Sequence, residues 1–135
     1  VQGLWYVAAL YPKIEHNMVK CFIMNFTVVN NNTIDVYMKG DERINSGKMS
    51  VVNNGSVWID PIGMISAWIS FDPVNGAWGT FVPYGTQGAF ILSRSPSLNT
   101  NIISSQLALL QSEGYQATMS NTYIVPNNCT TMKHI

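Results

Sequence analysis

The sequence predicts an all-β fold, an antiparallel meander of eight short strands followed by one helix. Segments rich in Val, Ile, Thr, Phe, Tyr and Trp recur along the chain, separated by clusters of Asn, Gly, Asp and Pro. This spacing is typical of strands joined by tight turns. A single later stretch has helical periodicity instead. Eight strands followed by one helix indicate an all-β domain with a single helix after its sheet.

The eight predicted strands follow one another with turn-forming residues between them. They are Leu4 to Leu10, Lys20 to Val29, Thr33 to Lys39, Gly47 to Val52, Val57 to Asp60, Ile65 to Phe71, Ala77 to Val82 and Ala89 to Ser93. Asn30-Asn31-Asn32, Gly40-Asp41 and Asn75-Gly76 favour tight turns between strands. The helix follows Ser95-Pro96-Ser97, covers about residues 99–113, and is expected to end at Gly114.

Alternation along the strands assigns side chains to the two faces of the sheet. In the second segment the even positions are apolar and the odd positions include Asn25, so we expect the even positions to face inward. Cys21 then faces outward, where it cannot serve as a nucleophile in a cavity. The same argument turns Ile34, Val36 and Met38 of the third segment inward.

Composition excludes several classes of partner. Charged residues make up only 10% of the chain, against about a quarter in an average protein. Seven basic and seven acidic residues cancel, and no basic stripe is present for nucleic acid or anionic lipid. The apolar runs are much shorter than the roughly 18 residues that span a bilayer. We therefore expect a soluble protein with no nucleic-acid partner and no transmembrane segment.

Two cysteines and four glycosylation sequons indicate secretion. Cys21 and Cys129 have no competing partner, so one long-range disulfide is the simplest interpretation. A metal site formed by these thiols and His134 is a poorer alternative, because three such groups make an incomplete tetrahedral set. The sequons are Asn25, Asn31, Asn54 and Asn128. Because the chain begins at Val1 without a leader, we interpret it as a mature or trimmed form.

Two motifs give the chain a resemblance to the lipocalins. Gly3-Leu4-Trp5-Tyr6 resembles the G-x-W motif that opens their first strand, and the segment from Phe90 to Leu98 resembles their third motif, in which an Arg ends the last strand. Within that family the chain is most similar to apolipoprotein D, lazarillo and the insect bilin-binding proteins. Glu15 to Cys21, the sequon at Asn25, and Cys129 carry this similarity.

The resemblance has one clear departure and several structural implications. The middle motif of the family, T-D-Y, aligns with Phe71-Asp72-Pro73, where only Asp72 agrees. The resemblance implies one domain over residues 1–135, with an eight-stranded up-and-down barrel over about 3–94, the helix outside it and a C-terminal tail over 120–135. Trp5 and Arg94 would plug one end, the guanidinium covering the indole face, and are structural residues.

The interior of such a barrel is the predicted ligand site. Aromatic and Met side chains dominate sites for flat apolar ligands. Trp68, which we place on the same register as Ser70, is expected to line the cavity and stack on the ligand. The predicted ligand-binding residues are Phe22, Met24, Phe26, Met38, Met49, Trp68, Trp78 and Phe90.

The polar residues expected near this site are explained by solvation or turn capping without a catalytic role. His16 lies in the predicted loop at the open mouth, within reach of a ligand carboxylate, although a lone loop His is usually just solvated. Asp72 precedes Pro73 in a turn, where Asp commonly caps its own loop. No nucleophile motif, metal signature or carboxylate pair is present, so we expect no catalytic residue, no metal and no enzymatic activity.

The expected function is extracellular binding, transport or sequestration of a small hydrophobic ligand, such as a fatty acid, retinoid, sterol, carotenoid or bilin. No cofactor is required, although a carotenoid, bilin or lipid fits as bound ligand. Two alternatives remain open. One is a pigment protein that holds a chromophore, and the other is a secreted module with a filled barrel that binds a protein partner through its loops. The oligomeric state is also open.

Overall fold

A closed antiparallel sheet forms the body of the computed structural model, which describes residues 2–12, 21–40, 43–52, 57–59, 65–82 and 88–127. The helix is α1 (Thr100–Ser112), and a short 3₁₀-helix (Met119–Asn121) follows it. The strands are β1 (Gly3–Tyr11), β2 (Ile23–Asn30), β3 (Thr33–Gly40), β4 (Arg43–Val52), β5 (Val57–Ile59), β6 (Ile65–Phe71), β7 (Trp78–Val82), β8 (Ala89–Ser93) and β9 (Tyr123–Ile124).

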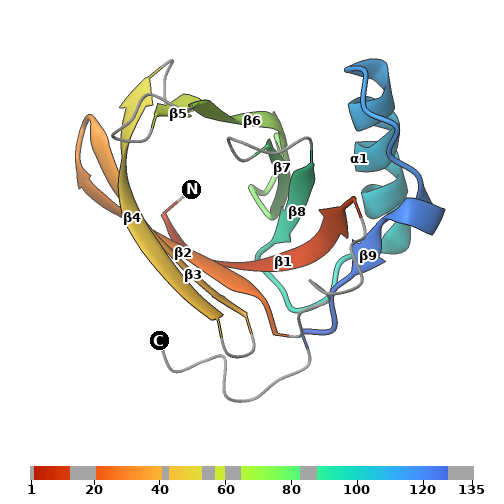
Figure 1. The fold of residues 1–135 in the computed structure, drawn as a ribbon, viewed down its shortest axis with the longest axis horizontal. Helices are drawn as coiled ribbons and strands as arrows, with labels where there is room; N and C mark the ends of the chain where they lie inside the picture. Colours follow the sequence, from red (N-terminus) through yellow and green to blue (C-terminus); the bar gives the residue numbers. More distant parts are fainter. Residues whose placement is uncertain are drawn as a thin grey trace.

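The first eight strands close into a barrel, as predicted. Each strand from β2 to β7 pairs with the next, β8 pairs with β1, and β1 pairs with β2 (Figure 1). Figure 1 shows α1 outside the barrel. Its buried residues Ile103, Leu107 and Leu110 pack in one cluster with Ala89 and Ile91 of β8. No helix in the described parts of the chain is long and apolar enough to cross a membrane.

The limits of α1 match the prediction of 99–113 to within one residue at each end. Asn99 caps the helix, because its side chain accepts a hydrogen bond from the backbone N–H of Asn101 at 2.7 Å. Gly114 follows the helix with φ of 98°, the left-handed conformation that glycine adopts without a steric penalty. The predicted stop at Gly114 is therefore confirmed.

The C-terminal segment packs against the barrel as far as residue 127. β9 pairs with β1 beside Ala9 and Leu10, and Val125 is buried in the core of the barrel. The ladder between β1 and β2 ends at Tyr6 and Ile23. Beyond this point, the edge of β1 that faces β2 can pair with another strand. The C-terminal segment occupies this edge, so the prediction of a tail from residue 120 is wrong for its first half.

Asn127 joins β1 and β2 through its side chain, beyond the point where their ladder ends. Its amide nitrogen donates to the Val7 carbonyl at 2.8 Å, and its oxygen accepts from the Phe22 N–H at 2.9 Å. The side chain is 4% exposed. The nitrogen and the oxygen of this buried amide therefore both have hydrogen-bond partners.

Two apolar clusters divide the strands into an inner and an outer face. The inner cluster fills the barrel with Trp5, Val7, Met24, Phe26, Ile34, Met49, Trp58, Phe81, Leu92 and Val125. Met24 and Phe26 alternate with Ile23, which packs with Tyr6 and Cys21 in a separate cluster. The predicted inward positions of β2 and β3 are thus confirmed at their buried residues, and Cys21 lies on the outer face as expected.

A register shift in β6 changes which side chains face inward. Trp68 pairs with Phe81, but Ser70 pairs with Thr80 and Phe71 with Gly79, so one extra residue lies between Trp68 and Ser70. Thr80 faces outward, where its hydroxyl donates to the Gln106 side chain of α1 at 2.7 Å. The prediction that Trp68 and Ser70 share a face is therefore wrong, and Phe71 takes the inward position.

Asp72 caps the turn between β6 and β7, as its position before Pro73 predicts. Its two carboxylate oxygens accept from the N–H groups of Val74 at 3.0 Å and Ala77 at 3.1 Å. These backbone donors lower the pKa of Asp72 below its ordinary value of 3.8. Asp72 is therefore a structural residue of this turn.

This pKa predicts a pH-dependent contribution of Asp72 to stability. Because the folded state lowers the pKa, the contribution is present above pH 3.8 and is lost as the pH falls through the folded value. We expect the stability difference between wild type and Asp72→Asn to shrink between pH 7 and pH 3. Urea unfolding followed by circular dichroism at both pH values measures it. An unchanged difference would contradict the assignment.

Candidate functional site

One end of the barrel is sealed by Trp5 and Arg94, as the sequence predicts. The indole of Trp5 is fully buried, and the guanidinium carbon of Arg94 lies 3.9 Å from the ring centroid. Arg94 also donates to the carbonyls of Leu4 and Gln2, each at 2.9 Å. Partial burial lowers the pKa of Arg94 from its ordinary value. The guanidinium thus fastens the first residues of β1 across the closed end.

Gly3 is required by this closed end. Its φ is 108°, a conformation that L side chains rarely adopt. A Cβ atom at this position would lie 3.2 Å from Nη1 of Arg94. The glycine of the G-x-W motif therefore lets the backbone pass close beneath the guanidinium.

Six aromatic rings form a packed floor above the plug. Trp68 is at its centre, with ring centroids 5.3 to 6.1 Å from those of five other rings in tilted or edge-to-face arrangements. Such arrangements are favoured by the quadrupoles of the rings. The members of this aromatic floor are Trp5, Phe26, Trp58, Trp68, Phe71 and Phe81.

Trp68 fits this floor because Gly79 faces it from β7. A Cβ atom at Gly79 would lie 2.7 Å from Cζ3 of the Trp68 ring, closer than real contacts allow. The Trp68 Nε1 atom is buried and has no hydrogen-bond partner in the described part of the protein. Packing against Gly79 therefore holds the ring, and no described residue offers its N–H a hydrogen-bond partner.

Trp68→Leu is expected to lower both stability and affinity for planar ligands. Loss of the ring contacts should reduce the free energy of unfolding by about 2–3 kcal/mol, and affinity for retinol should fall by about 1 kcal/mol or more. Trp68→Phe is the matched control, because it keeps a ring and removes the unsatisfied N–H. Thermal melts and retinol titrations measure both effects. Unchanged stability in Trp68→Leu would contradict the packing described above.

Beyond the floor, the inward-facing side chains are apolar but only partly buried. Phe22 and Phe90 meet edge to face with centroids 5.6 Å apart, and Leu10, Val36 and Met38 pack against the core on the same inner face. Residual exposure of inward-facing side chains means that solvent reaches them. This upper part of the barrel, bounded below by the aromatic floor, is the candidate ligand site.

The structure separates the predicted site residues into three groups. Phe22, Met38 and Phe90 line the candidate site. Met24 and Met49 are buried in the core, and Phe26 and Trp68 belong to the aromatic floor.

Trp78 is on the other face of the sheet. It pairs with Ser93 and alternates with the inward Gly79 and Phe81, so its predicted place on the cavity wall is corrected. The inward position in that part of β7 is taken by Gly79, because the Trp68 ring occupies the space that a side chain would need.

Three aromatic residues of the floor were not among the predicted site residues. Trp58 is fully buried and faces inward opposite Val51. Alternation within the predicted strand Val57 to Asp60 would have placed Trp58 on one face, but so short a strand does not show which face. Phe81 and Trp78 lie on opposite faces of β7. The inward position of Phe81 can be predicted only when Gly79 is known to face inward as well. Phe71 faces inward because of the register shift in β6.

Among the side chains that the structure describes, those packed in the barrel core are apolar apart from Ser66, which is buried opposite Trp58. The ion pair between Lys48 and Asp35, at 2.8 Å, lies on the outer face. Within the described residues no three His, Cys, Asp or Glu side chains are grouped to hold a metal ion. His16 lies outside those residues, so its proposed contact with a ligand stays a prediction.

Two of the four predicted glycosylation sites can be located. Asn25 lies on the outer face of β2, half-buried between its partners Leu4 and Tyr37. Asn31 is exposed in the turn between β2 and β3. Asn54 and Asn128 lie outside the described residues, as do Cys129 and His134.

Solved structures share this fold, although no known family model and no curated protein sequence matches the chain. The siderocalin Ex-FABP is 12% identical, covers 96% of this chain and 95% of its own, and has a TM-score of 0.74. Lobster apocrustacyanin A1 is 12% identical over 95% of this chain and 78% of its own, with a TM-score of 0.62. The cockroach allergen Per a 4 is 12% identical over 92% and 83%, with a TM-score of 0.63.

Sequence identities this low show that the fold is shared, and they show nothing about ligand or function. The closed meander of β1 to β8, the helix packed outside it and the Trp5–Arg94 plug agree with the architecture that the two sequence motifs imply. The siderocalin, crustacyanin and Per a 4 structures named above are lipocalins. The chain therefore has the lipocalin fold.

Proposed function

We propose that this protein is an extracellular lipocalin that binds a small, neutral, largely apolar molecule in the upper part of its barrel. The observation that carries the proposal is the chemistry of the inner cluster, whose packed side chains are apolar and rich in aromatic and Met residues. Apolar burial at about 25 cal/mol per Å² is enough to give micromolar affinity without a charged anchor. A retinoid, sterol, carotenoid, bilin or lipid fits this description.

The fold similarity supports a binding function. The siderocalin Ex-FABP is described as functioning through dual ligand specificities, and the siderocalin Q83, 16% identical with a TM-score of 0.73, as having a dual ligand binding mode. Secretion is supported by the sequons at Asn25 and Asn31, which lie on outer surfaces. The described part of the chain also contains no free cysteine.

Met38→Glu should weaken retinol binding at least tenfold, which is about 1.4 kcal/mol. Met38 faces the barrel interior between Met24 and residue 45, so an apolar ligand would have to desolvate the new carboxylate. The matched control is Tyr37→Glu, which places the same charge on the outer face of the same strand. Quenching of Trp fluorescence during retinol titration measures both affinities.

The outcomes separate the proposal from its alternatives. Equal weakening by both variants would contradict an interior site. No response of wild type to retinol, biliverdin and a fluorescent fatty acid would indicate a barrel filled by its own side chains and a role in binding a protein partner. A visible absorption band in protein from its natural source would instead indicate a pigment protein.

A further inference from the structure

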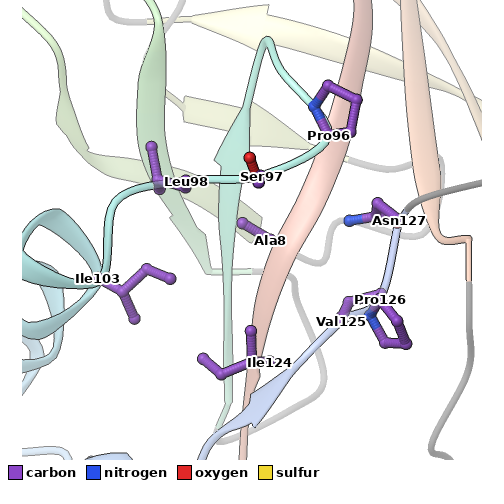
Figure 2. A pocket seen from close by; sticks show the side chains of 9 residues that line it. All are labelled: Ala8, Pro96, Ser97, Leu98, Ile103, Ile124, Val125, Pro126 and Asn127. Carbon is purple, nitrogen blue, oxygen red and sulfur yellow. The ribbon is translucent and has the colours of Figure 1, made fainter.

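A hollow lies outside the barrel, where β1, the loop after β8, α1 and the C-terminal segment meet. Its volume is about 420 Å³, and it is bounded by β1, the loop after β8, the first turn of α1 and the segment that begins with β9 (Figure 2). This is within the range of about 300–1,000 Å³ typical of sites for small molecules. Its lining includes Ile103 of α1, which packs against the outside of the barrel, so the hollow is distinct from the barrel interior.

The scaffold itself forms the floor of this outer hollow. Ala8, Ile103 and Val125 are at most 4% exposed, and each belongs to a different element (Figure 2). Ala8 lies where the register between β1 and β8 shifts, which gives its small side chain no direct partner in that ladder. Ile124, 43% exposed, stands at the rim with Ser97. A buried apolar floor with a polar group near its rim is a common form of small-molecule sites.

The lining indicates what kind of molecule this hollow would accept. None of its residues is charged, and its polar side chains are Ser97 and Asn127. The Asn127 amide is already bonded to Val7 and Phe22. The Ser97 side chain makes no hydrogen bond within the described residues, since its recorded bond is through the carbonyl. One hydroxyl at the edge of an apolar floor suits a ligand with a single polar end.

We propose that the outer hollow is a second binding site, for a small neutral molecule with an apolar body and one hydroxyl, carbonyl or aromatic amine group directed to Ser97. The site is independent of the proposed ligand in the barrel. Val125 separates the two, because it packs in the inner core and also lines the hollow.

Methyl NMR with a neutral probe locates the binding directly. In protein with methyl-labelled isoleucines, titration with N-phenylnaphthylamine should shift the resonances of Ile103 and Ile124, because the rings of the probe would lie against them. Ile34, buried in the barrel core, reports the interior, and Ile65, exposed on β6, reports non-specific contact. The same shifts of Ile103 and Ile124 should persist in Met38→Glu.

A blocking variant completes the test. Ser97→Trp fills the rim and should abolish the shifts of Ile103 and Ile124, while Val74→Trp, at an 82% exposed position in the turn after β6, should leave them unchanged. Thermal melts verify that both variants fold. The proposal is overturned if Ile103 and Ile124 do not move in wild type, if Ser97→Trp leaves their shifts intact, or if Met38→Glu removes them. A shift at Ile34 alone would support the barrel site and refute the outer one.

Discussion

Replacing Trp5 by alanine is expected to lower the free energy of unfolding by about 3–5 kcal/mol. The indole is fully buried and its centroid lies 5.6 Å from that of Trp68 and 5.9 Å from that of Phe71. Its removal leaves a hole at the closed end and takes away the surface on which the Arg94 guanidinium lies. Urea unfolding followed by circular dichroism measures the loss without depending on the deleted fluorophore.

Arg94→Lys provides the matched comparison for this end of the barrel. It keeps the positive charge but loses the planar fork that donates to the Leu4 and Gln2 carbonyls. Because the Arg94 side chain is only partly buried, we expect a smaller loss of about 1 kcal/mol. Retinol affinity should be little changed in either variant that remains folded. A Trp5→Ala protein with an unchanged melting temperature and no ligand binding would instead assign Trp5 to the ligand site.

Elements with a long periodic pattern could be predicted from the sequence. The limits of β6 and β8 are those that alternation and turn residues indicate, and α1 ends where Gly114 predicts. β9 could not be predicted, because two residues show no periodicity and its place depends on an edge of β1 that exists only in the folded barrel. The tail prediction failed for this reason.

The site was predicted less completely than the fold, because side-chain direction depends on register. Strict alternation puts Trp68 and Ser70 on one face, but a single extra residue in β6 turns Ser70 outward and Phe71 inward. A large aromatic such as Trp78 is a natural candidate for the interior. The Trp68 ring, however, takes the space opposite Gly79, and that packing between strands is not visible in the sequence of either one.

A disulfide between Cys21 and Cys129 is expected to add about 2–5 kcal/mol to the stability of the protein. The structure brings the C-terminal segment to Cys21, whose N–H donates to the Pro126 carbonyl at 2.8 Å. Asn127 is bonded to Phe22, the next residue. Cys129 follows Asn127 by two positions, a span of at most about 7 Å, and disulfides join Cα atoms about 4.4–6.8 Å apart. The bond would close a loop of more than a hundred residues, for which chain entropy predicts a contribution near the top of that range.

Thiol titration of the unfolded, unreduced protein should find no reactive thiol, and two reactive thiols would refute the bond. Cys21→Ser, Cys129→Ser and the double variant should all lose the same stability, because one absent partner already abolishes the bond and the effects cannot add. Equal stability losses in the three variants also test the alternative that the two cysteines and His134 bind a metal ion. A metal site would lose affinity stepwise with each ligand, and a chelator would destabilise the wild type. A disulfide predicts that the chelator has no effect, whereas a reductant lowers the wild type to the stability of the variants.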